Sequence, residues 1–263
     1  MTDIVIATSE SDARAAQAVE AHHAQLSGAL ALHTETLVAA AARGDRTRAE
    51  DARQALVAWS ATELLPHAAA EEKALYPAAQ TLPEGRLLVD AMLVEHGLIG
   101  DLVAQVERAD DPVRAAAAAT ALRTLFEAHL AKENDQVLPL LVVTSGVSLA
   151  DLLGDMHELL GHDVEAGQAP SGGCGGHACA CGEQDPDTYP ELDARAIPHA
   201  IRHATIFGAL EAVGVGGGLM LLAPHDPLPL LSQVGERWPG RFGVEYLERG
   251  PDTWRLALTR ASA

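Results

Sequence analysis

The chain has 263 residues, which is enough for one large domain or two of ordinary size, each with a core of its own. Its formal net charge of -19 at pH 7 argues against nucleic acid and anionic membranes as partners, because both are bound through lysine and arginine. Aromatic residues make up only 3% of the chain, and the abundance of alanine is typical of helices that pack closely.

Helical periodicity dominates the first 160 residues. The first apolar run breaks at Gly44, and Thr47 with Glu50 has the spacing of a capping box for a second helix. Pro66 lies inside that second helix and predicts a local kink. The run lengths and short connections predict an up-down-up-down four-helix bundle with a short fifth helix. The expected helices span residues 11–42, 47–76, 83–107, 111–139 and 148–161.

The composition changes after the bundle. Residues 163–190 are rich in glycine, proline and serine and contain all three cysteines, so we interpret them as a linker. Cysteines this close together cannot form a disulfide framework, which favours a reducing cytoplasm as the location. We find no pattern of a signal peptide and no apolar run of transmembrane length.

The last part of the chain, residues 191–263, alternates short apolar strands with helices. This order predicts a small α+β domain, a two-layer βαβαββ sandwich. The whole chain is therefore expected to be multi-domain, with a helical bundle at 11–162, the linker, and this domain. The expected strands are 191–194, 218–224, 241–247 and 253–259, and the expected helices are 198–212 and 228–238.

One motif occurs twice in the bundle. His67 is followed four residues later by Glu71, and His129 by Glu133. The first copy then ends in Leu-x-Pro and the second in Val-x-Pro. Residues four apart lie on one face of a helix, one turn from each other. Two such helices facing each other would offer two nitrogens and two carboxylates to the bundle interior, which predicts a metal site.

The repeat extends to the preceding helices. Laying the first helix on the third matches Val19 with Met92 and His23 with His96. His22 then lies further from the apolar stripe, and His33 lies ten positions beyond His23, roughly 15 Å along the helix. We therefore choose His23 as the first ligand and interpret His33 as a core histidine or an outer partner of the site.

Four histidines and two glutamates thus form the expected metal site. Imidazole and carboxylate without thiolate favour iron or manganese over a sulfur-rich zinc site. If each glutamate bridges two metals, an oxo or hydroxo bridge completes five ligands per metal and leaves a position for O2, NO or peroxide. The predicted cofactor is a pair of non-haem iron ions. The predicted ligands are His23, His67, Glu71, His96, His129 and Glu133.

This constellation resembles the hemerythrin-like (HHE cation-binding) family, whose pattern is H…H-x-x-x-E…H…H-x-x-x-E in a four-helix bundle. The resemblance covers about residues 13–141. Oxygen-carrying members have a further histidine where this chain has Gly100, and a final aspartate where it has Asn134. The resemblance therefore implies a protein closer to the NO-responsive and iron-sulfur-cluster repair members than to oxygen carriers.

Three residues beside the motif receive structural interpretations. Tyr76 follows the first motif, and we expect it to pack rather than take part in redox chemistry. Glu72 and Lys73 are expected on the surface.

The linker contains a second group of metal-binding residue types. Three thiolates and an imidazole would suit zinc, an iron-sulfur species or copper(I), although the spacing C-x-x-H-x-C-x-C is not that of a standard zinc finger. A flexible tether with free thiols is the alternative, and both interpretations stay open. The residues are Cys174, His177, Cys179 and Cys181.

The C-terminal stretch resembles a domain family of unknown function often found after hemerythrin-like domains, with a fold like that of the TusA/SirA sulfur carriers. Those carriers use a cysteine in Cys-Pro-x-Pro, whereas this chain has Ala196-Ile197-Pro198-His199, so persulfide transfer is not expected. A ligand site is one interpretation of the polar residues near its helix starts. The alternative is that Asp226 and Pro227 only begin a helix. The candidate ligands are His199, His203, His225 and Asp226.

Three functions remain in competition. The first is a cytoplasmic di-iron protein that binds O2, NO or peroxide in sensing or in oxidative and nitrosative stress, including iron delivery for cluster repair. The second is a di-iron oxidoreductase that reduces peroxide or NO with electrons from the linker thiols. The third is an adaptor in which metal only stabilises a bundle that presents the C-terminal domain to a protein partner.

Overall fold

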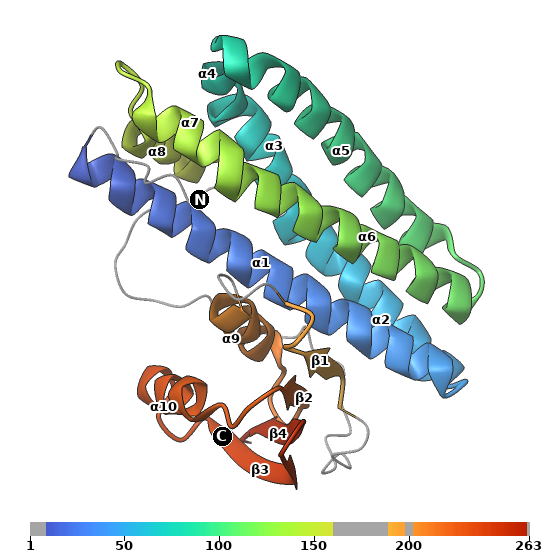
Figure 1. Cartoon of the computed structure of the whole chain (residues 1–263). Helices are drawn as coiled ribbons and strands as arrows, with labels where there is room; N and C mark the ends of the chain where they lie inside the picture. Colours follow the sequence, from blue (N-terminus) through green and yellow to red (C-terminus); the bar gives the residue numbers. More distant parts are fainter. Residues whose placement is uncertain (1–8, 160–188, 198–201, 262–263) are drawn as a thin grey trace.

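The computed structural model describes residues 9–159, 189–197 and 202–261 (Figure 1). A helical N-terminal part precedes a small sheet with two helices, which confirms the predicted fold class. The N-terminal α-helices and π-helical turns (η) are α1 (Glu10–Ala42), α2 (Arg46–Trp59), η1 (Ser60–Leu64), α3 (Leu65–Ala74), α4 (Tyr76–Gln80), α5 (Pro83–Arg108), α6 (Pro112–Lys132), η2 (Glu133–Val137), α7 (Leu138–Val143) and α8 (Leu149–Leu159).

Four long arms run alternately up and down to form the predicted bundle (Figure 1). The first arm is α1, the second is α2 with η1 and α3, the third is α5, and the fourth is α6 with η2 and α7. The short helix α4 turns the chain from the second arm to the third. The fifth helix, α8, packs against α1 and α3 near one end of the bundle.

Helix starts follow the capping residues of the sequence. Asp111 accepts hydrogen bonds from two amides of the first turn of α6, and Pro112 follows at a position where a missing N–H costs nothing. The predicted cap of the second helix is wrong, because Asp45 rather than Thr47 caps α2 and accepts from the Arg48 amide at 3.1 Å. A carboxylate is favoured there because it also meets the positive end of the helix dipole.

Both motif-bearing arms contain a π-helical turn beside a proline. The amide of Leu65 donates to the carbonyl of Ser60, five residues back, and the amide of Leu138 does the same to Glu133. Pro66 and Pro139 come next and have no N–H to donate, so the regular four-residue ladder is interrupted at these positions. The kink that Pro66 predicts is therefore realised as a widened turn.

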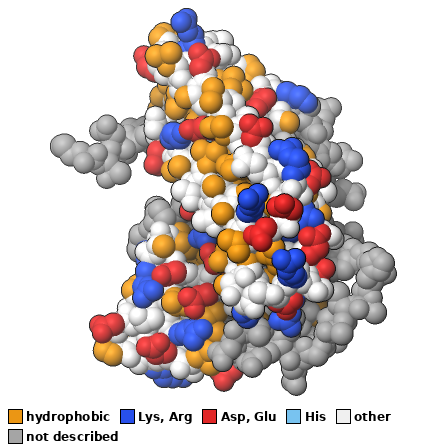
Figure 2. All heavy atoms as spheres, turned by 90° about the vertical axis from the view of Figure 1, so that its right-hand side faces the viewer, with side chains coloured by type: hydrophobic (Ala, Val, Ile, Leu, Met, Phe, Trp, Pro, Cys, Tyr) orange, Lys and Arg blue, Asp and Glu red, His pale blue; other side chains and the backbone are white. Residues whose placement is uncertain are grey.

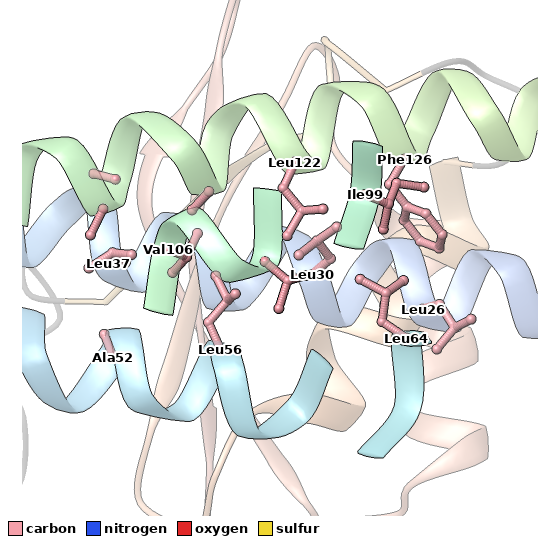
Figure 3. Close-up of a cluster of buried hydrophobic side chains, with 14 of the residues drawn as sticks. Leu26, Leu30, Leu37, Ala52, Leu56, Leu64, Ile99, Val106, Leu122 and Phe126 are labelled. Carbon is pink, nitrogen blue, oxygen red and sulfur yellow. The ribbon is translucent and has the colours of Figure 1, made fainter. Parts of the chain in front are cut away.

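Two apolar clusters fill the bundle and leave a polar layer between them. One cluster (Figure 3) contains Leu26, Leu64 and Ile99, and the other contains Val19, Ala70 and Met92. On three arms the predicted ligand lies between a residue of one cluster and a residue of the other. The ligands on these arms are His23 (between Val19 and Leu26), His67 (between Leu64 and Ala70) and His96 (between Met92 and Ile99).

The C-terminal part is a four-stranded sheet with the order β1-β2-β4-β3. The pair β1–β2 is parallel, and the pairs β2–β4 and β3–β4 are antiparallel, as a βαβαββ chain order requires. Each predicted element is present, and the helices pack apolar side chains on one face of the sheet. The elements are β1 (Glu191–Asp193), α9 (Arg202–Ala212), β2 (Gly218–Ala223), α10 (Leu228–Arg237), β3 (Phe242–Arg249) and β4 (Trp254–Arg260).

Helix α9 joins this domain to the bundle by crossing α1 (Figure 1). Gly28 of α1 and Gly208 of α9 allow backbones to touch, because a Cβ added at Gly28 would lie 2.2 Å from the carbonyl oxygen of Thr205. Ala31 and Leu32 of α1 are buried in the apolar cluster of the C-terminal domain. The two parts therefore share a core, a contact that the sequence did not predict.

One face of the bundle exposes apolar side chains (Figure 2). Leu87, Val94 and Leu98 of α5 are among the exposed large hydrophobic residues. No helix among the described residues is long and apolar enough to cross a membrane.

Candidate metal centre

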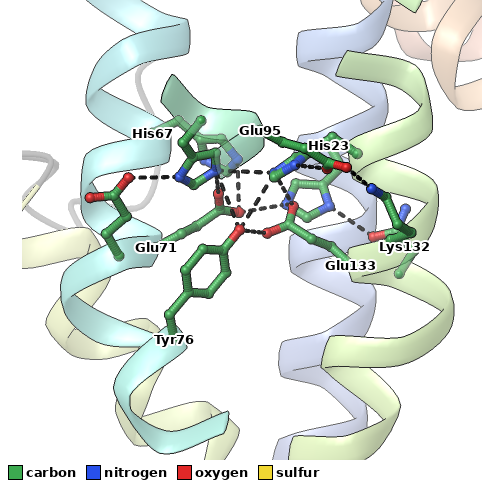
Figure 4. A network of polar contacts seen from close by, with 11 residues as sticks. His23, His67, Glu71, Tyr76, Glu95, Lys132 and Glu133 are labelled. Atoms are coloured by element: carbon green, nitrogen blue, oxygen red, sulfur yellow. Dashed lines mark hydrogen bonds and ion pairs between the residues drawn. The ribbon is translucent and has the colours of Figure 1, made fainter. Parts of the chain in front are cut away.

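The six residues predicted as ligands come together in the polar layer of the bundle (Figure 4). They project from α1, α3, α5, α6 and the first residue of η2. Their exposed fractions lie between 1% and 8%, so the bundle shields all six from solvent. Buried groups of this kind are costly unless they are paired or bind a metal.

The donor atoms form two groups that share Glu71. Its Oε1 lies 3.1 Å from His23 Nε2 and 3.0 Å from His67 Nε2. Its other oxygen, Oε2, lies 3.6 Å from His96 Nε2, which in turn is 3.0 Å from His129 Nε2. One oxygen of this carboxylate thus faces His23 and His67, and the other faces His96, which lies beside His129; a carboxylate that bridges two metals needs partners at both oxygens.

Glu133 also spans the two groups. Its Oε2 lies 3.6 Å from His129 Nε2 and 3.7 Å from His23 Nε2, one imidazole of each group. This oxygen has no hydrogen-bond partner although it is buried. A positive ion beside it would supply the missing partner.

Three imidazoles are held from outside by a hydrogen bond to Nδ1. Each acceptor is a carboxylate or amide oxygen, so Nδ1 carries a proton and Nε2 is the nitrogen that each ring turns toward the cluster. Lys132 forms an ion pair with Glu95 and so positions one of these acceptors. The pairs are His23 with Asn134 at 2.8 Å, His96 with Glu72 at 2.9 Å and His129 with Glu95 at 3.0 Å.

His67 is the exception among the four imidazoles. Neither of its ring nitrogens has a hydrogen-bond partner, although its Nε2 lies close to Glu71. A buried imidazole without partners is unfavourable by about 1–3 kcal/mol. A metal ion bound at Nε2 would remove this cost. The side chains of the cluster therefore fit the predicted iron or manganese ion.

The charges of the cluster are coupled. Burial alone would lower the pKa of His23, but the hydrogen bond to Glu71 and the charges of Glu133 and Glu71 outweigh it and raise the pKa to about 9. Burial opposes ionisation of Glu71, yet the surrounding imidazoles of His67, His23 and His96 hold its pKa well below the usual range. Without a metal, protons therefore supply positive charge to the cluster, and a metal ion would take their place.

Tyr76 is a site residue whose role the sequence did not predict. Its ring points from α4 into the cluster (Figure 4), and its hydroxyl donates to Glu133 Oε1 at 2.5 Å. Burial, together with the charges of Glu71 and Glu133, raises the pKa of this phenol. The sequence signal was faint: Tyr76 takes the place that Leu138 has in the second copy of the repeat.

Three other interpretations of the sequence can be compared with the geometry. Glu72 is on the surface as expected, but it also holds the His96 ring, which the surface interpretation missed. His33 lies beside Trp59, with ring centroids 5.4 Å apart, and belongs to neither donor group. His22 stands edge-on to His67 at 4.9 Å and is also outside both groups.

The candidate ligands of the C-terminal domain do not form a cluster among the described residues. His203 Nδ1 lies 3.3 Å from Gln233 Oε1, and His225 is exposed. Asp226 accepts a hydrogen bond from Tyr246 at 2.9 Å and does not cap α10, so the alternative of a helix cap is wrong for this residue. His199 and the linker residues Cys174, His177, Cys179 and Cys181 lie outside the described residues.

Comparison with known families assigns both parts of the chain. Residues 14–141 match the family described as hemerythrin HHE cation binding domain, and this range contains all six predicted ligands. Residues 191–260 match an uncharacterized conserved protein family, DUF2249. No curated protein and no solved structure matches the chain significantly.

Proposed function

Since residues 14–141 belong to the hemerythrin HHE cation-binding family, we propose that this chain is a non-haem di-iron protein that binds O2, NO or peroxide. Its proposed role is sensing, or handling of oxidative and nitrosative stress, including iron delivery for cluster repair. The proposed compartment is the cytoplasm, on the ground that its three cysteines lie too close together for a disulfide framework.

The observation that supports two metal ions is the sharing of Glu71 and Glu133 by two pairs of imidazoles. His23 and His67 form one pair, and His96 with His129 forms the other. Each pair lacks enough donors for a first-row metal by itself, and the shared carboxylates provide oxygens to both. Carboxylates that join two metals are typical of two-metal sites with ions a few ångströms apart.

The donor types support iron. Nitrogen and oxygen donors without sulfur suit iron and manganese. When bound, a pair of irons would supply the redox chemistry and the affinity for small oxidants that protein side chains lack.

The protein side chains shield and orient this chemistry. The outer acceptors Asn134, Glu72 and Glu95 hold three imidazole rings in a fixed orientation, which keeps their Nε2 atoms directed at the proposed metal positions. Because the ligands are at most 8% exposed, only small molecules can reach the site without opening the bundle. This favours a diatomic gas or peroxide over a larger substrate.

Metal content per chain is the first test. Wild type reconstituted anaerobically with Fe(II) is expected to hold about two irons, the stoichiometry of a two-metal site. His67→Ala and His129→Ala remove a donor from different pairs and are each expected to lose stoichiometric iron. His33→Ala is the matched control, because it removes a bundle histidine that belongs to neither pair.

A triple variant, Cys174→Ser with Cys179→Ser and Cys181→Ser, separates the bundle from the linker. Iron content unchanged in this variant is expected. Iron lost here but kept in His67→Ala would contradict the proposal and place the metal in the linker.

Adding O2, NO or peroxide to the iron-loaded protein tests the ligand. A change in visible absorption that is absent from His129→Ala is the expected result. Steady consumption of peroxide or NO with a reductant would instead support the oxidoreductase, and neither a spectral change nor consumption would support the adaptor.

A further inference from the structure

The hydroxyl of Tyr76 lies among atoms that are themselves candidate metal ligands. It is 2.5 Å from Glu133 Oε1, 3.3 Å from His96 Nε2 and 3.5 Å from His129 Nε2. The residue is 2% exposed, and its ring stacks on that of His96 with centroids 5.3 Å apart. Packing and hydrogen bonding thus hold the oxygen at this place.

These separations match the spacing of ligands around one metal ion. Metal–nitrogen and metal–oxygen bonds of about 2.0–2.2 Å place neighbouring donor atoms about 3 Å apart. His96 Nε2 and His129 Nε2 are 3.0 Å apart, and the Tyr76 oxygen completes a triangle with them at 3.3 and 3.5 Å. The three atoms therefore surround one position, with Glu133 beside it.

The proton count at this position also favours a metal ion. His96 and His129 each donate from Nδ1 to an outer carboxylate, so the atoms that the two rings turn toward each other are their Nε2 nitrogens. The single hydroxyl proton of Tyr76 goes to Glu133. A further proton can bridge only two of the three facing atoms, whereas a metal ion binds all of them at once.

In the part of the chain that the structure describes, no hydroxyl oxygen holds a comparable place at the other donor pair, His23 and His67. His23 and His67 contact Glu71 and Glu133, and the ring of His22 stands edge-on to that of His67. On the third arm, Gly100 lies one turn beyond His96 and has no side chain that could give the His96–His129 pair another donor. The phenol reaches that pair from α4 instead.

We propose that Tyr76 is a seventh protein ligand, whose phenolate oxygen binds the metal ion held by His96 and His129. This inference rests on the proposed di-iron function. On binding, the O–H bond of the phenol breaks, its proton leaves to solvent, and an oxygen–metal bond forms without any change of oxidation state. A bound cation stabilises the deprotonated form of such a ligand. The two metal positions are therefore chemically different, with a phenolate at only one of them.

The ferric protein provides a direct readout. Ferric phenolates have a visible charge-transfer band, and resonance Raman excitation within it enhances the ring vibrations of the bound tyrosine. We expect both signals in the iron-loaded, oxidised wild type. Tyr76→Phe is expected to lose both while it still contains iron, because the six other ligands remain.

The chain has three tyrosines, which supplies the control. In the double variant Tyr189→Phe with Tyr246→Phe, Tyr76 is the sole tyrosine, and both signals should persist at wild-type strength. This variant keeps the inference testable even if Tyr76→Phe does not fold.

Iron-loaded ferric wild type without a phenolate signal would overturn the ligand assignment and leave the di-iron proposal standing. A signal that survives in Tyr76→Phe, or disappears in the double variant, would also overturn it. Failure of wild type to bind iron at all would instead refute the proposed function, and the assignment with it.

Discussion

At the scale of single residues, the geometry of the proposed metal site depends on side chains that are not themselves predicted ligands. Glu95 accepts the Nδ1 proton of His129 and forms an ion pair with Lys132. It fixes which ring nitrogen of His129 faces the cluster, and it lies on a different arm from His129.

Glu95→Ala should weaken metal binding about 10–100-fold, the usual effect of removing an outer partner of a ligating histidine. The affinity can be measured by competition with a chelator. Asp101→Ala is the control, because Asp101 is an exposed acid on the same helix. Equal affinities of the two variants would show that Glu95 does not position the ring.

His33 is a histidine that the site does not use. Burial lowers its pKa to about 4, whereas an unfolded chain would have a histidine pKa of about 6.5. Between pH 6.5 and 4, His33 therefore binds a proton in the unfolded state but stays neutral in the folded state. The stability associated with neutral His33 is present above this pH and is lost as the pH falls towards 4.

We expect His33→Gln to reduce the acid destabilisation of the metal-free protein between pH 6.5 and 4. One such group contributes a slope of up to about 1.4 kcal/mol per pH unit. Denaturant unfolding across this window, in the presence of a chelator, measures the slope. His203→Gln removes an exposed histidine and should leave the slope as in wild type. The same slope in both variants would contradict the assignment.

At the scale of elements, a proline in each motif-bearing arm interrupts the helix close to the predicted ligands. In the second arm, η1 ends before His67, so His67 and Glu71 both lie in regular α3. In the fourth arm, η2 begins at Glu133 itself. A π-helical turn changes the rotation of the helix that follows, and such turns are frequent at functional sites. The two copies of one motif thus reach the same cluster through different local geometry.

The crossing of α1 and α9 is a second element-scale feature. A Cβ added at Gly28 would lie 2.4 Å from the backbone nitrogen of Ala209, and one added at Gly208 would lie 2.7 Å from Gln25 Cα. Backbone atoms cannot move aside as a flexible side chain can, so only glycine allows this separation of the helices.

Gly28→Ala should therefore push α9 away from α1 and destabilise the protein by about 1–3 kcal/mol, the usual cost of overpacking. Denaturant unfolding gives the free energy, and hydrogen exchange in α9 shows where protection is lost. Gly97→Ala is the matched control, because a Cβ there meets nothing within 4 Å, and it should be neutral or slightly stabilising. Equal stability of both variants would refute the tight crossing.

At the scale of the whole molecule, helix α1 contributes buried side chains both to the bundle interior and to the core of the C-terminal domain. His23 faces the cluster of histidines and glutamates in the bundle, while Ala31 and Leu32 are buried against the C-terminal domain. The bundle and the C-terminal domain are thus in contact through helix α1. The net charge of -19 acts on the same scale, because a strongly negative field raises the local concentration of cations around the protein.

The sequence by itself determined the arms of the bundle and the six residues that meet between them. A helix repeats every 3.6 residues, so the spacing of His67 to Glu71 and its copy in the fourth arm already placed each pair on one face. The register of the repeat then separated His23 from His33. The order of strands and helices after residue 190 likewise predicted the α+β domain, because short apolar runs and turn residues alternate there.

Only the tertiary structure decided what surrounds those six residues. Asn134 reaches His23 across 111 positions, and Tyr76 reaches Glu133 across 57. Contacts between different arms follow from how the arms rotate and how deep they pack, and no periodic pattern within one helix encodes them. The same reason applies to Gly28 and Gly208, whose close approach depends on a crossing between elements far apart in the chain.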